Sequence, residues 1–546
     1  MKSVLQKYWT KNRTAVFVSL WLAFMLCIYA PLELYMTNIG EFWFDIYVLF
    51  PICAVLFLLA MVVQLILYAV VNAFLPRVGH VISVLHFAGT LALYVQGNYL
   101  VKNLPPLDGT DVYFWEYKAD MRMSLIVWSG IFVVVCVGAW LLKGKMKSVM
   151  RYASIILVLT LAVTGLTLTL SNGGMVRKQN MISTDKAVLD MSSNQNFVIL
   201  ILDSVDSEVF EALLDDFPEY REAFADFTYY RDVVSLYPCT NEAIPFFYSG
   251  DVYENGEPFE DWEARCYTES PLLERLQAEG YRLGSYTEDV AASENSLIFE
   301  NVGSGVERVS DYPRFAKLLM RYVGLRYAPF QCKEYFFRSI NISFSELRCS
   351  PFEEADLWRF NGSNRDFLDD IQGKEVVVGE ENCFRFIHVE GAHVPFHYSK
   401  DVEYIQYGTY GLSAASALTV TKEYLQKLKD AGVYDNTAII VMADHGYDPE
   451  LVHRYDPMLM VKGFGESHDL EKSMLPVSYL DLQEAYQNLL DGKTGEDVFD
   501  MITDLDRIRR CLRYEFTEEE RMEEYYFHGA VWESDKWIPT GNVYIR

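Results

Sequence analysis

The sequence predicts two parts of different fold class: a bundle of five membrane-spanning α-helices at residues 1–172 and an α/β domain at residues 196–546. Three observations support this division. The apolar residues, 51% of the 546-residue chain, are concentrated before residue 172. Beyond the linker, short β-rich runs alternate with amphipathic stretches, which indicates a largely parallel sheet with helices on both faces. Most acidic residues also lie in this second part.

Five apolar stretches precede residue 172, and each is long enough to cross a hydrocarbon core of about 30 Å as a helix. They cover residues 14–35, 46–75, 79–100, 122–142 and 151–172. The first lacks a small-residue cleavage site and is followed by four more. We therefore expect it to be a retained helix rather than a signal peptide.

The charges between these stretches predict an orientation. Basic residues precede the first stretch and lie between the second and third and between the fourth and fifth, whereas the alternate connections are acidic. By the positive-inside rule the N-terminus is expected in the cytoplasm, and the chain beyond residue 172 outside the cell (plasma) membrane. The polar residues 173–195 are predicted to be a linker, and residues 512–546 a C-terminal β-rich extension.

Charge also restricts the partners of the second part. Residues 1–172 contain twelve basic and seven acidic residues, whereas the remainder contains 35 basic and 68 acidic residues, a net charge of −33. Nucleic-acid binding requires basic surface, so we expect no nucleic-acid partner. The same balance argues against the domain lying flat on anionic lipid.

Polar side chains follow the two most apolar β-type runs. Asp203 comes directly after Val198–Leu202, and Asp444 and His445 follow the run AIIVMA. Residues at the carboxyl ends of parallel strands face the cleft in which α/β sheets bind ligands. Carboxylates and imidazoles in such a cleft are typical ligands of a divalent metal. The alternative for Asp203 is an ordinary helix N-cap.

A hydroxyl and several histidines could complete this site. Thr240, in YPCTNEAIPFFYSG, begins a helix-like segment, and a hydroxyl near a metal can become a nucleophile. The alternative is an N-cap, with Cys239 in a disulfide. Five of the nine histidines fall between residues 388 and 453. His393, after the Gly391 turn, is the better ligand candidate, whereas His388 lies in an apolar run and is expected to be a core residue.

Six of the nine cysteines lie beyond residue 172, where an oxidising environment would permit up to three disulfides. The pairing cannot be derived from their positions. No CxxC pair occurs, so we do not expect a zinc site made of thiolates.

These residues, in this order, resemble the alkaline-phosphatase-like, sulfatase-fold enzymes over about residues 10–470. The resemblance is specifically to their membrane branch of lipoteichoic acid synthases and lipid A phosphoethanolamine transferases. It implies five N-terminal helices and an extracytoplasmic catalytic domain of alkaline phosphatase/sulfatase type. It also implies a site with Thr240 as nucleophile, with four metal ligands, and with two histidines that contact the substrate phosphate: Asp203, Thr240, Asp444 and His445 for the metal, and His393 and His453 for the substrate.

Two departures from the family pattern are informative. The transferases usually have Glu at the position of Asp203. Sulfatases mature a Cys or Ser within C/S-x-P-x-R to formylglycine, but here Cys239 is followed by TNEA, with neither the Pro nor the Arg. The resemblance therefore favours the unmodified Thr240 hydroxyl as the nucleophile over sulfate-ester hydrolysis through formylglycine.

The function implied by the resemblance is transfer of a phospholipid head-group phosphate, of the phosphoglycerol or phosphoethanolamine type, through a phospho-threonine intermediate. The donor would be a phospholipid of the bilayer, and the acceptor a cell-envelope glycan, lipid or polymer. The donor set suits Mn²⁺ or Zn²⁺ better than Mg²⁺. Two alternatives remain open at this point: a metal-dependent phosphodiesterase, phosphatase or sulfatase-like hydrolase at the membrane surface, and a membrane receptor without catalytic activity.

Overall fold

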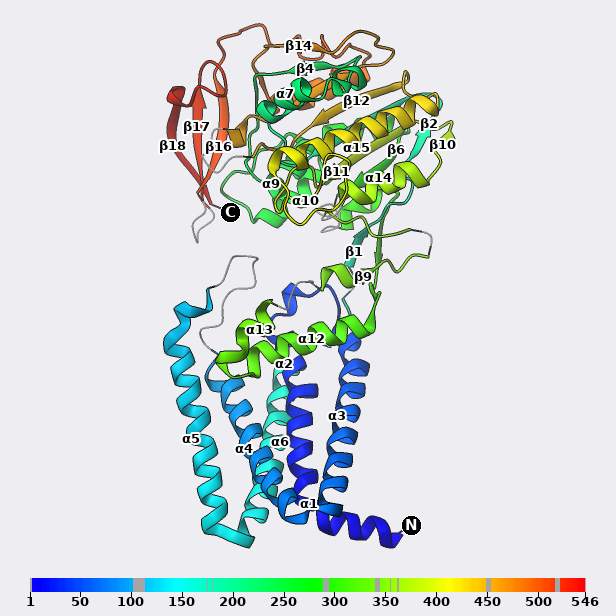
Figure 1. Ribbon diagram of the computed structural model, residues 1–546. Coiled ribbons are helices and arrows are strands. Elements are labelled where there is room, and N and C mark those ends of the chain that lie inside the picture. Colours follow the sequence, from blue (N-terminus) through cyan, green and yellow to red (C-terminus); the bar gives the residue numbers. More distant parts are fainter. Residues whose placement is uncertain are drawn as a thin grey trace. The chain divides into compact units, whose positions relative to one another are not determined.

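The computed structural model describes residues 2–101, 113–173, 175–178, 180–287, 294–338, 344–353, 355–360, 363–447, 453–515 and 521–545. The chain forms two compact units (Figure 1). The membrane unit consists of Met1–Gln179 and Val306–Pro351, and the α/β unit consists of Asn180–Gly305 and Phe352–Arg546.

The membrane unit contains long apolar helices. Their bounds are α1 (Lys2–Phe24), α2 (Ala30–Thr37), α3 (Ile46–Phe74), α4 (Pro76–Tyr99), α5 (Lys118–Leu142) and α6 (Met146–Ser171). A π-helical turn, Met25–Tyr29, joins α1 to α2. We attribute it to Pro31, which lacks an N–H and whose ring would clash with the carbonyl one turn earlier in a regular helix.

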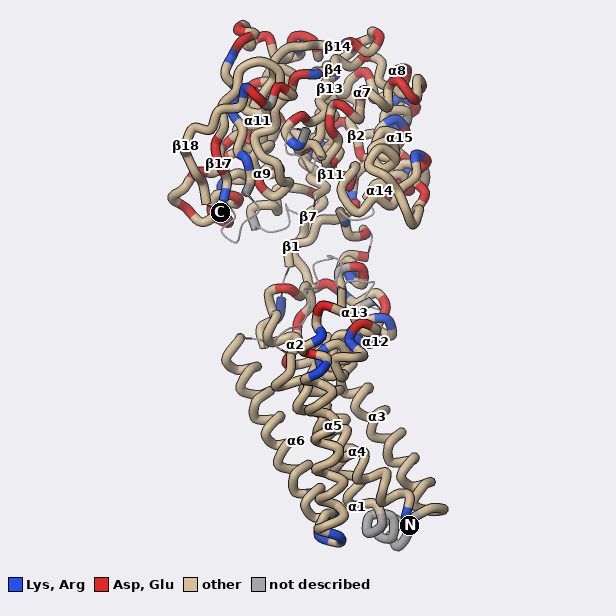
Figure 2. Tube along the Cα trace, turned by 60° about the vertical axis from the view of Figure 1, so that its left-hand side comes forward, with Lys and Arg blue, Asp and Glu red and all other residues tan. Residues whose placement is uncertain are grey.

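Four segments of the described residues have the length and composition of a membrane span. The last of these segments, Phe114–Ser171, contains both α5 and α6, which are separated by a short 3₁₀ turn at Lys143–Lys145. The predicted bundle of five helices is therefore confirmed. Its outward side chains are apolar and exposed, for example Leu58 (60%) and Val134 (71%), as expected of a surface that faces lipid. Figure 2 shows few charged residues along these helices.

The membrane unit also contains a segment that we assigned from the sequence to the α/β domain. Val306–Pro351 carries β8 (Arg308–Val309), α12 (Tyr312–Tyr327), α13 (Lys333–Arg338) and β9 (Arg348–Cys349). α12 is amphipathic and buries Phe315, Leu318 and Leu319 against the membrane helices. The predicted 196–546 domain is therefore interrupted, because an amphipathic stretch does not reveal which unit covers its apolar face.

Part of the predicted linker, residues 173–195, also belongs to a folded unit. It contains β1 (Asn180–Ser183) and β2 (Asp190–Ser192), both in the α/β unit. β1 pairs with β7 (Val302–Gly305), and β2 pairs with β10 (Val377–Gly379). Each strand is only three or four residues long, too short for a periodic signal in the sequence.

The α/β unit is built on a seven-stranded sheet. In spatial order its strands are β14 (Glu471–Ser473), β4 (Thr228–Tyr230), β13 (Leu459–Lys462), β12 (Thr437–Met442), β3 (Asn196–Leu202), β11 (Cys383–Val389) and β6 (Arg282–Tyr286). The four strands from β12 to β6 are parallel, and β13 runs antiparallel to both of its neighbours. The largely parallel sheet predicted from the sequence is confirmed.

Helices cover both faces of this sheet, as the alternating sequence predicts. One face packs against α7 (Ser207–Asp216), α8 (Glu219–Ala223), α14 (Ser363–Gly373) and α15 (Tyr410–Asp430). The other packs against α9 (Thr240–Ser249), α10 (Phe259–Thr268), α11 (Pro271–Ala278) and α16 (Leu482–Leu490). All of β3 is buried, and each of its apolar side chains, from Phe197 to Leu202, enters one of these two cores.

The C-terminal residues form a separate antiparallel sheet of β16 (Arg509–Glu515), β17 (Arg521–Phe527) and β18 (Trp537–Ile545). A further short pair joins β5 (Val233–Val234) to β15 (Val477–Ser478). All nine cysteines of the chain are free thiols. The disulfides that the sequence permitted are therefore absent from this structure.

Candidate metal centre

The alternation of side chains along the strands brings the two predicted carboxylates to one face of the sheet. Phe197, Ile199 and Ile201 of β3 face the core that contains α9, and Asp203 continues this odd-numbered series. In β12, Ala438, Ile440 and Met442 face the same core, and Asp444 continues the even-numbered series. Because β3 and β12 are adjacent and parallel, both carboxylates emerge at the same edge, next to the start of α9.

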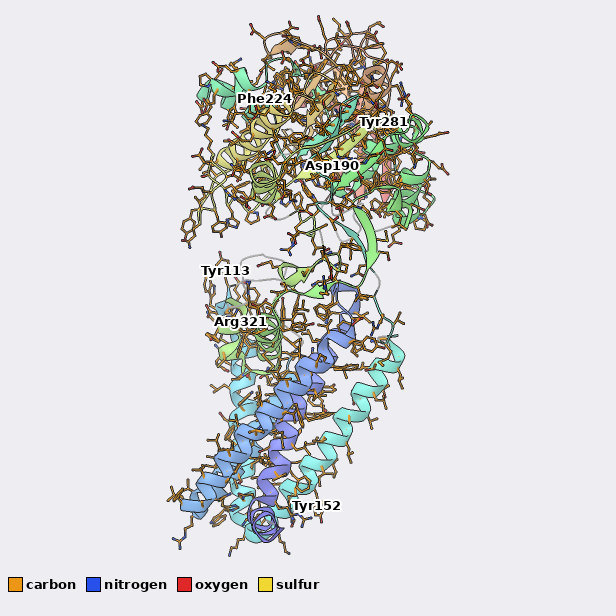
Figure 3. The ribbon with its side chains drawn as sticks, turned by 90° about the vertical axis from the view of Figure 1, so that its right-hand side faces the viewer. Tyr113, Tyr152, Asp190, Phe224, Tyr281 and Arg321 are labelled. Atoms are coloured by element: carbon orange, nitrogen blue, oxygen red, sulfur yellow. The ribbon has the colours of Figure 1, made fainter. Side chains whose placement is uncertain are left out.

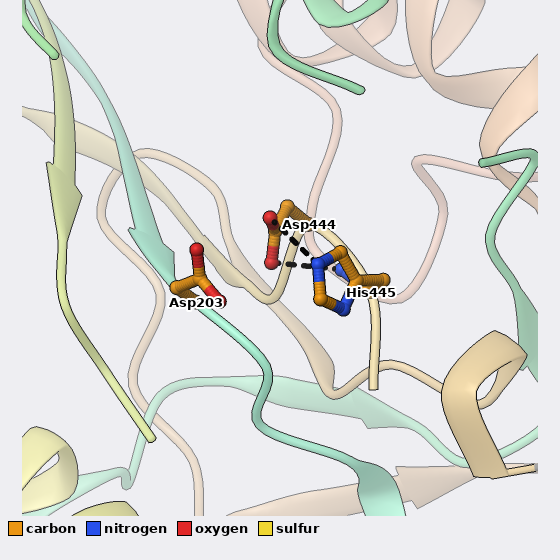
Figure 4. A group of neighbouring side chains, drawn as sticks. All are labelled: Asp203, Asp444 and His445. Carbon is orange, nitrogen blue, oxygen red and sulfur yellow. Dashed lines mark hydrogen bonds and ion pairs between the residues drawn. The ribbon is translucent and has the colours of Figure 1, made fainter. Parts of the chain in front are cut away.

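Thr240 is the first residue of α9 and lies between these two carboxylates. Its Oγ1 is 2.7 Å from Asp444 Oδ2 and 3.1 Å from Asp203 Oδ2. The ligand atoms of Asp203, Asp444 and His445 all lie within 4.8 Å of one another. Figure 4 shows Asp203 at the end of β3 and the other two side chains on the loop after β12. The structure thus brings together the four predicted ligands.

His445 is oriented by its own loop. Its Nδ1 lies 2.8 Å from the carbonyl oxygen of Gly446, which can only accept a hydrogen bond, so Nδ1 carries the proton. When the ring is neutral, the lone pair of Nε2 is therefore available to a ligand, and Nε2 is 3.4 Å from Asp444 Oδ2. A metal-binding histidine commonly has its other ring nitrogen held in this way.

Asp444 is held by two backbone N–H groups. Its Oδ1 accepts hydrogen bonds from Ser204 N at 3.1 Å and from His445 N at 2.9 Å. The two bonds engage one carboxylate oxygen and leave Oδ2 to face Thr240. The N-cap alternative for Asp203 is not observed, because Asp206 caps α7 by accepting from Val209 N at 2.7 Å.

His388 lies beside the site although its sequence context predicted a core residue. It is buried, at 2% exposure, and its Nε2 is 3.4 Å from Asp203 Oδ2. In β11 it continues the series of Phe384 and Phe386, which face the same core as Asp203. Strand parity was the signal that could have identified it, but only once the pairing of β11 with β3 was known.

Burial alone would raise the pKa of Asp203. The contact of His388 Nε2 with Asp203 and the charges of protonated His445, His388 and His393 outweigh this effect and hold the pKa well below its usual value. Asp203 is therefore a carboxylate under all physiological conditions, although it is only 1% exposed.

A glycine permits the close approach that positions Asp203. Gly391 has φ +58°, and a Cβ there would lie 2.4 Å from both the backbone N and O of Asp203. Asn364 fixes this turn from the other side, because its side chain accepts from Gly391 N and donates to Gly391 O, at 2.9 and 2.8 Å. The next residue but one is His393, which lies near enough to lower the pKa of Asp203.

The donor set fits a divalent cation. Asp203 and Asp444 are 1% and 0% exposed, and two buried carboxylates at this separation repel each other unless a positive charge lies between them. Two carboxylate oxygens, a hydroxyl oxygen and an imidazole nitrogen are ligands for Mn²⁺, Zn²⁺ and similar ions.

The thiol next to Thr240 is not a competing nucleophile. Cys239 is the N-cap residue of α9 but makes no side-chain capping bond. Burial, with a smaller contribution from Glu242, raises its pKa to about 12, so the thiol is protonated at neutral pH. The alternative for Thr240, an N-cap beside a disulfide, is therefore wrong: Thr240 is the first helical residue and its hydroxyl faces the carboxylates.

Of the two histidines predicted to contact substrate, only His393 has a described side chain. His393 is half-buried and packs edge-on against Phe360, with ring centroids 5.4 Å apart. The backbone of His453 begins a short 3₁₀ helix, His453–Tyr455, but its side chain lies outside the described part of the structure. Their roles toward substrate stay predictions. Arg454, which the sequence analysis did not consider, donates from Nε to Pro238 O at 2.7 Å, directly before Cys239 and Thr240.

A search of curated proteins finds no match. Among solved structures, the lipoteichoic acid synthase LtaP from Listeria monocytogenes matches at 13% identity, 65% coverage of this chain, 91% of that chain and a TM-score of 0.34. A protein of the alkaline phosphatase superfamily from Vibrio parahaemolyticus matches at 12% identity, with coverages of 67% and 81% and a TM-score of 0.34.

A phosphonate monoester hydrolase from Silicibacter pomeroyi matches at 12% identity, with coverages of 64% and 88% and a TM-score of 0.34. The model of one protein family, described as Sulfatase, matches residues 195–475. This range contains Asp203, Thr240, Asp444 and His445 and more than half of the 546 residues. The chain therefore belongs to the sulfatase family.

Proposed function

We propose that the protein transfers the head-group phosphate of a membrane phospholipid to a hydroxyl of a cell-envelope glycan, lipid or polymer, with Thr240 as the nucleophile. One observation carries the proposal: the Thr240 hydroxyl lies 2.7 and 3.1 Å from two buried carboxylates that also converge with His445. A structural threonine at a helix start would instead bond the helix backbone.

The proposed reaction consists of two displacements at phosphorus, with Thr240 as the nucleophile of the first. Thr240 Oγ1 forms a bond to phosphorus, and the bond from phosphorus to the diacylglycerol oxygen breaks. The hydroxyl proton of Thr240 passes, directly or through solvent, to that oxygen, so diacylglycerol leaves as a neutral alcohol. An acceptor hydroxyl oxygen then bonds to phosphorus, the bond from Thr240 Oγ1 to phosphorus breaks, and the proton of the acceptor hydroxyl passes to Thr240 Oγ1. His393, and His453 if its side chain reaches the site, would contact the non-bridging oxygens.

Enzymes of this superfamily use divalent metals, and Asp203, Thr240, Asp444 and His445 would hold one here. A bound metal would lower the pKa of the Thr240 hydroxyl and offset the charge on the phosphate. We propose Mn²⁺ or Zn²⁺, because the set includes an imidazole nitrogen. The N-terminus of α9 supports the same step, since its free backbone N–H groups favour an anion at this position.

The membrane unit supports a lipid donor. Its helices place the protein in the bilayer, so donor and enzyme share one surface and need not meet by diffusion in three dimensions. We propose the orientation predicted from the loop charges, with the N-terminus in the cytoplasm and the α/β unit outside the plasma membrane.

The direct test is a covalent-intermediate experiment on the full-length protein in detergent. The protein is incubated with Mn²⁺ or Zn²⁺ and with phosphatidylglycerol or phosphatidylethanolamine, without acceptor, and then digested for mass spectrometry. We expect the mass of the head-group phosphate on the peptide that contains Thr240. Thr240→Ala should lose the label and lose transfer by about 10³-fold or more, and Thr240→Ser should keep part of both.

Cys239→Ala is the matched control, because it removes the adjacent side chain but leaves the hydroxyl. It should keep the label. Full transfer by Thr240→Ala, or a label on another residue, would refute the mechanism. Added glycerol separates transfer from hydrolysis: a transferase yields a glycerol adduct, whereas a hydrolase releases only the free head-group phosphate.

A further inference from the structure

α12 lies across one end of the membrane helices (Figure 1). Its side chains Phe315, Leu318 and Leu319 pack in one cluster with Tyr35 of α2 and Leu49 of α3. These two residues mark the C-terminal end of α2 and the N-terminal end of α3, which lie at the same end of the bundle. α12 therefore lies where helices that cross the hydrocarbon core leave it.

Contacts with the ends of α4 and α5 place α12 at the same end of the bundle. Tyr327, the last residue of α12, packs directly on Gly97 near the C-terminus of α4, where a Cβ would lie 2.3 Å from the tyrosine ring. Just beyond α12, Phe330 N donates to Ser124 Oγ near the start of α5, at 3.1 Å. The helix is thus fixed to α2, α3, α4 and α5, at the level of the lipid head groups.

The face of α12 opposite the bundle is basic. Arg314, Lys317 and Arg321 are spaced i, i+3 and i+7, so they lie on one face of the helix. Arg314 and Lys317 are exposed, and Arg321, labelled in Figure 3, is half-buried. α12 itself contains four basic residues and no acidic one. Helices at a membrane surface carry Lys and Arg on their polar face and bury their apolar face in the lipid; in α12 the apolar face packs on the membrane helices instead.

The charge of this segment is opposite to that of the rest of the chain beyond the membrane helices. Residues 306–351 contain eight basic and four acidic residues, whereas residues 173–546 as a whole contain 35 basic and 68 acidic residues. Several acids at this end of the membrane unit are held by partners. They are Glu33 with Arg326 (2.7 Å), Glu307 with Arg348 (2.6 Å), and the helix N-caps Asp45 and Asp311.

Neither Arg314 nor Lys317 forms an ion pair within the described parts of the chain. Their charges are therefore available to an external anion. Tyr312 and Tyr335, on α12 and α13, are 51% and 73% exposed. Exposed tyrosines are enriched at the boundary between hydrocarbon and water, where the ring and the hydroxyl meet different environments.

We propose that the outer face of α12 binds the phosphate groups of anionic membrane phospholipids, with the exposed Arg314 and Lys317 as the main contacts and Arg321 beside them on the same face. Because the chain beyond residue 172 is acidic in total, its net charge argued against contact with anionic lipid. α12 is a basic helix within this acidic part of the chain. Basic residues at a membrane surface attract anionic head groups over about one Debye length. The face would enrich such lipids around the bundle whether or not the α/β unit transfers their head groups.

The test measures lipid selectivity of the full-length protein reconstituted in phosphatidylcholine vesicles. Spin-labelled phosphatidylglycerol or phosphatidylcholine reports, by electron paramagnetic resonance, the fraction of each lipid immobilised at the protein. Wild type should prefer phosphatidylglycerol, and the preference should fall as salt is raised. The triple variant Arg314→Gln/Lys317→Gln/Arg321→Gln should lower it by about fivefold or more.

The matched control is Lys422→Gln/Lys427→Gln/Lys429→Gln, which removes three charges from a helix of the α/β unit, α15, and should leave the preference unchanged. If the triple variant does not fold, Arg314→Gln/Lys317→Gln changes only the two exposed residues and should show a smaller loss of lipid preference.

An unchanged lipid preference in a folded variant would overturn the proposal. A lower unfolding temperature together with an unchanged preference would also overturn it, and would indicate that this face pairs with acids of the protein itself. Because phosphatidylglycerol binding is read without turnover, failure here is distinct from failure of the transfer mechanism.

Discussion

Replacement of Asp444 by Asn separates a metal-binding role from a structural one. The substitution keeps the shape of the side chain, and its Oδ1 can still accept from Ser204 N and His445 N. It changes the oxygen that faces Thr240, Asp203 and the predicted metal into an amide nitrogen. If the two carboxylates exist to bind a cation, their charges repel each other in the metal-free wild type, and Asp444→Asn should remove this repulsion.

The size of the effect follows from the geometry. The ligand atoms of Asp203 and Asp444 lie within 4.8 Å of each other. At an effective dielectric constant of about 20, two unit charges at this distance repel by about 3 kcal/mol. Asp444→Asn should therefore stabilise the metal-free protein by up to this amount, about 5 °C in the unfolding midpoint of a unit of this size. A metal at about a hundred times its Kd should stabilise wild type by about 2.7 kcal/mol and the variant much less.

The assay is thermal unfolding of the full-length protein in detergent, in a chelator and then in Mn²⁺ or Zn²⁺. Asp456→Asn is the matched control, because Asp456 is equally buried but pairs with Arg231 at 2.8 Å. It should destabilise the protein by a similar amount with and without metal, since it leaves Arg231 without its buried partner. The reasoning would be refuted if Asp444→Asn were strongly destabilising in chelator while metal left wild type unchanged.

Three further predictions concern other parts of the chain. A reporter that is active only in the cytoplasm should be active when fused after residue 145 and silent after residue 195; the reverse pattern would exclude the proposed orientation. Gly391→Ala should weaken metal binding measured by calorimetry at least tenfold, because its Cβ would displace the backbone of Asp203, whereas Gly373→Ala, with open space around it, should not. Alkylation of the denatured, unreduced protein should label nine thiols, since all nine cysteines are free; fewer would contradict the structure.

Most elements of the fold could be predicted because their signals are long. The membrane helices extend over twenty or more apolar residues, and β3 and β12 are unbroken apolar runs. The segment 306–351 could not be placed in the same way. An amphipathic helix such as α12 shows that an apolar face is buried but not what covers it. Its partners, Tyr35 and Leu49, are more than two hundred and fifty residues earlier in the chain.

In the metal centre, too, some residues have a local sequence signal and others depend on contacts with distant segments. Asp203, Asp444 and His445 could be proposed from sequence because each follows a buried strand, where a polar residue has left the sheet. His388 could not, because a histidine within a strand looks like a core residue until the neighbouring strand is known. Gly391 likewise gave no local signal, since its role depends on the backbone of Asp203, which is 188 residues away along the sequence.

The sequence by itself determined which parts of the chain are apolar enough to cross a membrane, which runs form buried strands, and which residue types stand at their ends. These properties are local, because they depend on composition and periodicity within a few turns or one strand. Only the tertiary structure decided that β3 and β12 are adjacent, that Thr240 lies between their carboxylates, and that α12 belongs to the membrane unit. Those are contacts between distant segments, and they follow from how the whole chain buries its apolar surface.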